Sequence, residues 1–73
     1  MIQPWEAQLS ALRDAGVVLV IRVDIVGFTV EALDAGNAFA YILQDVTCQS
    51  FPEVIETVNR EWTRYTDMRK DAA

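Results

Sequence analysis

Histidine is absent from this chain of 73 residues, and cysteine occurs once, as Cys48. Histidine is the side chain that most often acts as a general base or binds a transition metal, so its absence argues against an enzyme and against a metal or cofactor site. A single cysteine forms no disulfide within the chain, whereas small secreted domains usually contain several. The chain is therefore expected to be non-enzymatic, to need no cofactor, and to work in a reducing compartment, most simply the cytoplasm.

Long apolar runs are also absent. The longest apolar segment begins at Val17, and Arg22 and Asp24 interrupt it well before the ~20 residues that a membrane-spanning helix needs. The first residues carry no positively charged side chain, so they do not have the pattern of a signal peptide. The sequence predicts a soluble protein that does not bind a membrane.

Positive charge is scarce, since 6 lysine and arginine residues stand against 11 aspartate and glutamate residues, a net charge of −5. Such an acidic chain is repelled by nucleic acid and by anionic membranes, so neither is expected as a direct partner. Hydrophobic residues nevertheless make up 52% of the chain, too many for a disordered segment. At this length the chain is expected to fold as a single domain, residues 1–73.

The first half of the chain predicts a helix followed by two strands. Pro4 suits the first turn of a helix and Gly16 suits the position after its end, so a helix is expected over residues 4–15. Residues 17–25 are mostly β-branched and apolar, which favours a strand. Residues 28–33 alternate between two kinds of side chain, the pattern of a half-buried second strand.

The second half predicts a turn, a third strand and a long helix. Residues 34–37 (Asp-Ala-Gly-Asn) have the composition of a hairpin turn, because glycine and asparagine accept positive φ angles, and residues 38–44 follow as a strand. Ser50 and Glu53 have the spacing of a helix capping box. Behind them, apolar residues recur on one arc of a helical wheel, with charged residues opposite. The arc contains Phe51, Val54, Ile55, Val58, Trp62 and Tyr65.

Together these segments predict an α+β fold with the order α-β-β-β-α, in which a three-stranded antiparallel meander carries two helices on one face. The first strand is apolar on both sides, with Leu19 and Ile21 on one side and Val18 and Val20 on the other. A strand of this kind is normally covered on both sides. The alternative arrangement places one helix on each face of the sheet and leaves neither side open.

With both helices on the Leu19 side, the other side of the sheet exposes an apolar patch. Val18 and Val20 are expected at its centre, and Leu33, Ala40 and Ile42 are expected to extend it. Exposed apolar patches of this kind usually mark an interface.

Three carboxylates lie on or beside the expected strands, namely Asp24, Glu31 and Asp45. Such groups hold divalent metals in some hydrolases, which makes a metal-dependent hydrolase the remote alternative. Their spacing matches no known motif, and acids at strand ends are usually solvated. Cys48 has no cationic neighbour in the sequence that would activate its thiol, so a partly buried structural thiol is expected.

Acidic residues dominate residues 1–56, where only Arg13 and Arg22 are basic. The acids are Glu6, Asp14, Asp24, Glu31, Asp34, Asp45, Glu53 and Glu56. This balance fits an acidic surface that docks on a basic groove of another protein, and it equally fits an ordinary soluble domain. The basic residues of the last helix scatter over several of its faces, as expected for a solvated helix end; they are Arg60, Arg64, Arg69 and Lys70.

Two segments carry a family resemblance, residues 27–31 (Gly-Phe-Thr-Val-Glu) at the start of a strand and residues 51–58 (Phe-Pro-Glu-Val-Ile-Glu-Thr-Val) at the start of a helix. With the turn between them, residues 27–62 resemble HicB-type antitoxins. The resemblance implies a βββα core that neutralises a small toxin RNase by protein contact. The segment rich in proline and glycine that precedes the third strand in that family is missing here, as is a DNA-binding domain, so no functional residues are transferred.

The expected function is a small acidic protein-binding module, most simply an inhibitor that occludes a basic, nucleic-acid-binding surface of its target protein. As a class, such a chain is similar to phage-encoded inhibitors of host defence such as anti-CRISPR proteins, which would work in the host cytoplasm. The alternatives are a HicB-like antitoxin and an adaptor module that forms a homodimer. The residues expected at the interface are Val18, Val20, Arg22, Asp24, Glu31, Leu33, Asp34 and Asp45.

Overall fold

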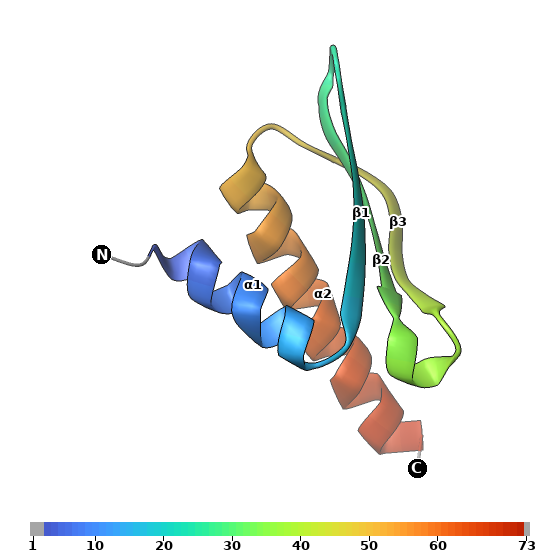
Figure 1. Cartoon of the computed structure of the whole chain (residues 1–73). Helices are drawn as coiled ribbons and strands as arrows, with labels where there is room; N and C mark the ends of the chain where they lie inside the picture. The colour runs from blue at the N-terminus through green and yellow to red at the C-terminus, as the bar shows by residue number, and fades with distance from the viewer. Residues whose placement is uncertain (1–2, 73) are drawn as a thin grey trace.

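The computed structural model describes residues 3–72, with side-chain positions through Arg69, and has the predicted α+β order (Figure 1). Helix α1 (Pro4–Asp14) leads into strands β1 (Val17–Asp24), β2 (Gly27–Asp34) and β3 (Ala40–Cys48), and helix α2 (Phe51–Ala72) follows. A short 3-10 helix, η1 (Ala35–Asn37), joins β2 to β3. The strands form an antiparallel sheet in the order β1-β2-β3, so the predicted meander is confirmed.

Helix α1 begins where the sequence predicts and ends one residue earlier. Pro4 takes the first helical position, where no partner for a backbone N–H is needed. The Gln3 N–H donates to the Glu6 carboxylate at 3.2 Å, which satisfies a backbone donor near the start of the helix. Beyond the other end, Gly16 has a φ of +86°, a conformation that favours glycine and turns the chain into β1.

A two-residue turn, Ile25-Val26, joins β1 to β2. The Asp24 carboxylate accepts a hydrogen bond from the Val26 N–H at 2.9 Å and holds this turn. Gly27 follows with a φ of +130°, and a Cβ at this position would lie 2.5 Å from the Cys48 carbonyl oxygen on β3. Glycine is therefore required here, because β3 approaches the start of β2 too closely for a side chain.

The third strand starts later and runs further than predicted. The sequence predicted residues 38–44, whereas β3 spans Ala40–Cys48. Two register shifts against β2, on either side of Ala32, insert extra residues into β3, and Asp45 adopts a left-handed φ of +52° at one of them. These bulges break the alternation on which the prediction relied, because each extra residue reverses the side of the sheet to which the following side chains point.

The connection from β2 to β3 also differs from the predicted hairpin turn. Positive φ angles occur at Ala38 (+56°) and Phe39 (+58°) rather than at Gly36 or Asn37. The chain instead forms η1, and the Asp34 carboxylate caps it by accepting from the Gly36 N–H at 3.0 Å. A residue with a side chain adopts the left-handed conformation at a cost of about 1 kcal/mol or more, so contacts elsewhere in the fold offset this cost.

Helix α2 starts at the predicted capping box, with one change of partner. The Ser50 hydroxyl accepts from the Glu53 N–H at 3.3 Å, as predicted. The Glu53 carboxylate accepts from the Gln49 N–H, one residue earlier than a capping box requires. Behind this start the predicted apolar arc faces the sheet, and its fully buried members are Val54, Ile55 and Val58.

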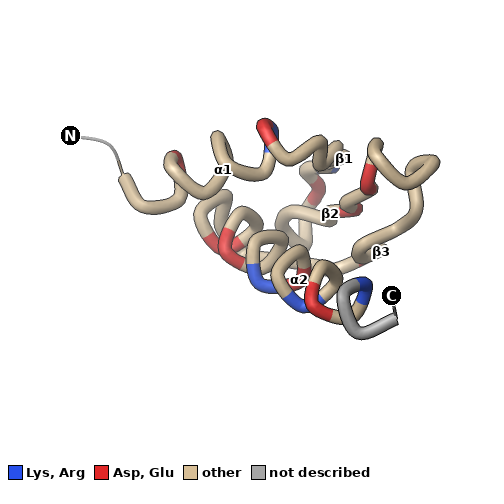
Figure 2. The backbone as a smooth tube through the Cα atoms, turned by 90° about the horizontal axis from the view of Figure 1, so that it is seen from below, with Lys and Arg blue, Asp and Glu red and all other residues tan. Residues whose placement is uncertain are grey.

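Both helices lie on the same side of the sheet, as predicted, which is also visible from below in Figure 2. The core draws on both helices and all three strands; its buried residues are Leu12, Val17, Val30, Ala32, Leu43, Cys48, Val54, Ile55 and Val58. Trp5 and Phe51 meet edge to face with ring centroids 5.2 Å apart, which joins α1 to α2. Leu19 and Ile21 pack against this core, so β1 turns its other side away from the helices.

The C-terminal part of α2 is fastened to the end of β2 and to η1 by an anchoring cluster, which consists of Asp34, Asn37, Trp62, Tyr65 and Arg69. The Arg69 guanidinium donates to the Asp34 carboxylate at 3.0 Å, and the Asn37 amide donates to the Tyr65 hydroxyl at 2.9 Å. The Tyr65 ring stacks on Trp62 and lies beneath Arg69. Arg69 is exposed, as predicted for a solvated helix end, but its ion pair with Asp34 was not predicted; the side chain of Lys70 lies outside the described residues.

Candidate binding surface

The side of the sheet opposite the helices forms the candidate binding surface, which we call the open face. Its residues are Val18, Val20, Arg22, Thr29, Glu31, Leu33, Tyr41, Asp45 and Thr47. One cross-strand row is apolar, because Val18 pairs with Leu33 and Leu33 pairs with Tyr41. Val18 and Tyr41 are 38% and 52% exposed. Paired residues on neighbouring strands project to the same side, so these three side chains make a continuous apolar strip across the sheet.

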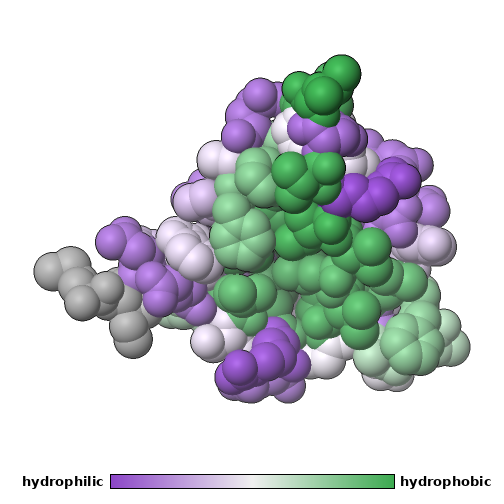
Figure 3. All heavy atoms as spheres, turned by 45° about the horizontal axis from the view of Figure 1, so that its top comes forward, coloured by the Kyte–Doolittle hydropathy of each residue, from purple (hydrophilic) through white to green (hydrophobic). Residues whose placement is uncertain are grey.

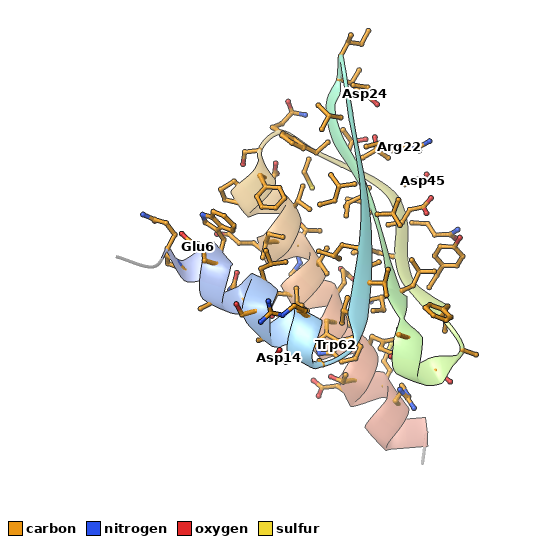
Figure 4. All side chains as sticks on the ribbon, viewed as in Figure 1. Glu6, Asp14, Arg22, Asp24, Asp45 and Trp62 are labelled. Carbon is orange, nitrogen blue, oxygen red and sulfur yellow. The ribbon has the colours of Figure 1, made fainter. Side chains whose placement is uncertain are left out.

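Towards the β1–β2 turn the open face becomes polar. Val20, which is 45% exposed, pairs with Glu31, and Arg22 pairs with Thr29 one row further along. The Arg22 guanidinium lies 3.6 Å from the Asp45 carboxylate, on the side of the sheet away from both helices (Figure 4). Both side chains are largely exposed, so this ion pair contributes little to stability.

Most of the predicted interface residues lie together on the open face, namely Val18, Val20, Arg22, Glu31, Leu33 and Asp45, and Asp24 lies beside them at the turn. Asp34 is the exception. Only 2% of it is exposed, and it lies on the helix side of the sheet with Arg69. Every second residue of β2 from Val30 onward is buried, and this series includes Ala32 and ends at Asp34. The prediction that Asp34 belongs to an exposed interface is therefore wrong.

Ala40 and Ile42 do not extend the open face as expected. Ala40 pairs with the buried Asp34, and Ile42 packs against the core. The extra residue at the second register shift changes the alternation, and Tyr41 reaches the open face instead. Sequence reasoning missed Tyr41 because a bulge leaves no pattern in a single sequence; the aromatic ring among strand residues was the only signal.

The β1–β2 hairpin projects beyond the helices and ends in an apolar hairpin tip, formed by Val23, Ile25 and Val26 (Figure 1). Val23 is 74% exposed and Ile25 is fully exposed. Val23 shares the side of β1 that carries Leu19 and Ile21, but it lies past the part of the strand that the helices cover. Figure 3 shows a band of hydrophobic residues over the middle of the molecule and a further hydrophobic group at its top. Turns usually contain glycine, asparagine or aspartate, so apolar β-branched residues in this turn were a signal that sequence reasoning did not use.

The acidic residues whose side chains the structure describes do not gather on one face of the molecule. Figure 2 shows Asp and Glu on α1, on α2 and along the sheet, with Lys and Arg interleaved on α2. On the open face, Arg22 offsets part of the charge of Glu31 and Asp45. The open face therefore combines an apolar strip with a small negative charge, and it lacks the broad acidic surface that the sequence suggested.

The three carboxylates considered for a metal site do not come together as one group. Glu31 pairs with Val20 on β1. Asp24 lies four residues after Val20 on the same strand, and at the rise of a β-strand this separates the two positions by about 13 Å. Asp24 holds the turn, and Asp45 pairs with Arg22. Within residues 3–72, no group of three or more His, Cys, Asp or Glu side chains lies close enough to hold a metal ion. The geometry lends nothing to the hydrolase alternative.

The single cysteine is part of the core. Cys48 is buried, and its Sγ lies 3.9 Å from the Thr57 hydroxyl oxygen. A thiol in this position packs as a small apolar group between β3 and α2, which agrees with the prediction of a structural thiol.

Comparison with protein-family models, with curated proteins and with solved structures gives no match for this chain. The resemblance to HicB-type antitoxins and the similarity in class to anti-CRISPR inhibitors stay predictions from the sequence. Neither helix in the described part of the chain combines the length and the apolar composition that crossing a membrane requires. What the chain does is therefore inferred from the open face and the hairpin tip.

Proposed function

We propose that the chain is a non-catalytic protein-binding module and that the open face contacts a protein target with a basic surface. The observation that carries this proposal is the strip of Val18, Leu33 and Tyr41, which the folded chain leaves uncovered. An apolar and aromatic centre with polar residues around it is the usual anatomy of a protein interface.

The charge of the chain favours a basic target. Its net charge is −5, and Glu31 lies on the open face one row from the apolar strip. A positively charged groove is attracted to such a chain before contact, and the apolar strip then supplies the short-range contact. An inhibitor that occludes a nucleic-acid-binding surface, of the kind that blocks host defence, is the function that fits this combination best.

The ion pair between Arg22 and Asp45 favours a second candidate function. It neutralises two of the charged groups on the open face, so that a mainly apolar contact is also available. Such a contact suits a HicB-like antitoxin or a dimeric adaptor module. The two candidates differ in salt dependence, because added salt screens attraction between exposed charges and leaves apolar contact largely unaffected.

The proposal is tested by comparing two variants that add the same charge at two different places. The target is captured from a lysate of the source or host cells with tagged wild-type chain, identified, and purified. Its affinity is then measured by calorimetry for the wild type, Tyr41→Glu and Met68→Glu. Met68 is 64% exposed on α2, the helix on the opposite side of the sheet, and is the matched control. We expect Tyr41→Glu to weaken binding at least about tenfold and Met68→Glu to change it less than about twofold.

Salt titration of the wild-type complex separates the two candidates. Strong weakening between about 0.1 M and 1 M salt, where the Debye length falls from about 10 Å to about 3 Å, supports the basic target. Affinity that does not change over this range supports the apolar adaptor. Equal affinities of Tyr41→Glu and wild type would place the contact elsewhere on the chain and overturn the proposal.

A further inference from the structure

The two edge strands of the sheet, β1 and β3, differ in how readily another strand could pair with them. Strand β3 is interrupted by two register shifts and carries Gln44 and Asp45 at a bulge, features that hinder pairing with another strand. Strand β1 pairs with β2 in a regular register, contains no proline, and has Arg22 as the only charged residue between Val17 and Val23. Proteins normally protect an exposed edge strand with charged residues, proline or a bulge, so a regular apolar edge indicates that another strand pairs with it.

The free edge of β1 offers its hydrogen-bonding groups in a fixed pattern. Residue pairs across antiparallel strands alternate between hydrogen-bonded and non-hydrogen-bonded pairs. The Ala35 N–H donates to the Gly16 carbonyl at 3.0 Å, so every second residue from Gly16 onward bonds to β2. Among the described strands, none lies on the other side of β1. The backbone N–H and C=O groups directed to that free side belong to Val17, Leu19, Ile21 and Val23.

We propose that β1 pairs antiparallel with β1 of a second copy of the chain, which joins two three-stranded sheets into one six-stranded sheet. The register that uses every outward-directed residue has its two-fold axis at Val20. This register places Val17 opposite Val23 of the second copy and Leu19 opposite Ile21 of the second copy. The two-fold symmetry repeats each pair once, and every pair exchanges two hydrogen bonds, which gives about eight hydrogen bonds in total. A shift of two residues in either direction leaves an outward-directed residue without a strand partner.

The shape of the monomer makes this edge complementary to itself. Helix α1 lies beside the half of β1 that contains Val17, whereas the other half projects past the helices and ends in the hairpin tip (Figure 1). The two-fold axis sets the bare half of each copy beside the half that carries α1 in the other copy. Val23 and Ile25 then gain neighbours that the monomer does not provide. A single strand from an unrelated protein would pair with the edge and leave the tip exposed.

The charged residue on the paired edge, Arg22, does not oppose this pairing. Arg22 lies opposite Val18 of the second copy, so the two Arg22 residues are four residues apart along the strands, about 13 Å. That separation exceeds the Debye length of about 8 Å at physiological ionic strength. At the axis Val20 meets Val20, which is a favourable cross-strand pair. Tyr41 stays free, so the dimer goes beyond the proposed function by presenting two open faces side by side.

The mass of the chain in solution tests this proposal. Sedimentation equilibrium of the wild type at micromolar concentration should give twice the monomer mass of 8.2 kDa. Val20→Glu and Val20→Lys each place like charges together at the axis and should be monomeric. A mixture of these two variants should restore a dimer, because opposite charges then meet at the axis. Val20→Thr keeps the β-branched shape without a charge and should stay dimeric.

Two further variants distinguish edge pairing from a dimer that stacks two open faces. Val23→Pro removes an outward-directed N–H that β2 does not use, at a residue that is 74% exposed, and should weaken the edge dimer at least about tenfold. Tyr41→Glu lies on β3, away from the paired edge, and should leave the edge dimer unchanged. A stacked dimer would show the opposite responses.

A wild-type chain that is monomeric at micromolar concentration overturns the proposal, and so does a dimer that Val23→Pro leaves intact. If Val20→Glu fails to fold, Val23→Pro decides the question by the same measurement. Tyr41→Glu reports on target binding and Val23→Pro reports on the β1 edge, so failure of either proposal is distinguishable from failure of the other.

Discussion

The two ends of the sheet are held in opposite ways. Where β2 meets η1, the anchoring cluster fastens α2 through an ion pair and a hydrogen bond that join residues far apart in the sequence. At the other end, the β1–β2 hairpin projects past both helices and exposes its apolar tip. The comparison separates two roles, because the anchored end stabilises the monomer whereas the projecting end is available to a partner.

Burial of charge explains why the anchored end is the more sensitive to substitution of its side chains. Asp34 is 2% exposed, and a carboxylate removed from water is unfavourable unless a cation or hydrogen-bond donors face it. Arg69 and the Gly36 N–H supply these partners. The hairpin tip buries no such group, and its side chains contribute little to folding.

The largest loss of stability is expected from a substitution at a close backbone contact in the projecting end. Gly27→Ala places a Cβ 2.5 Å from the Cys48 carbonyl oxygen at a φ of +130°. We expect a loss of about 3 kcal/mol in the free energy of unfolding, because the backbone strain alone costs about 1–3 kcal/mol and the strands also have to separate. Urea denaturation followed by circular dichroism measures this loss.

Gly16→Ala is the matched control for Gly27→Ala. Its φ is +86°, but no atom lies within 4 Å of the added Cβ, so only backbone strain of about 1 kcal/mol is expected. Equal losses for the two variants would contradict the steric argument. A larger loss at Gly27 would show that the projecting end is constrained in its backbone while its side chains are free.

The second largest loss of stability is expected from a substitution in the anchored end. Arg69→Ala leaves Asp34 without its guanidinium partner, a change that costs about 3–5 kcal/mol for a fully buried pair. Arg69 is 53% exposed and Asp34 keeps the Gly36 N–H, so we expect about 2 kcal/mol. Arg64→Ala, at an exposed position of the same helix, should cost less than about 0.5 kcal/mol. Equal stability of these two variants in urea would show that the ion pair does not fasten α2.

Features of the fold that depend on neighbouring residues were predictable from the sequence. Pro4 and Gly16 bounded α1, and Ser50 started α2, since helix ends are set by local backbone chemistry. The two-sided apolar pattern of β1 also predicted the open side with Val18 and Val20. These predictions needed only spacing along one element.

Features that depend on distant residues were not predictable. The register shift between Ala32 and Leu33 places Tyr41 on the open face, and the cause of this shift lies in the pairing of β3 with β2. The ion pair between Asp34 and Arg69 joins residues 35 positions apart, so the pattern of neither segment predicts it. The structure thus places the β1 residues of the candidate surface on the open face, and it places Asp34 on the helix side, where a long-range contact decides the side.

The smallest effect on stability is expected at the hairpin tip. The double variant Ile25→Ser, Val26→Thr changes side chains that are largely exposed, and it keeps the Val26 N–H that donates to Asp24. The free energy of unfolding should therefore change by less than about 0.5 kcal/mol, measured at a dilution where the chain is monomeric. A loss above about 1 kcal/mol would show that the tip packs on its own monomer and would remove the contrast between the two ends. With stability unchanged, apolar residues in a turn that usually contains polar ones are explained by contact with a partner, because the monomer gains nothing from them.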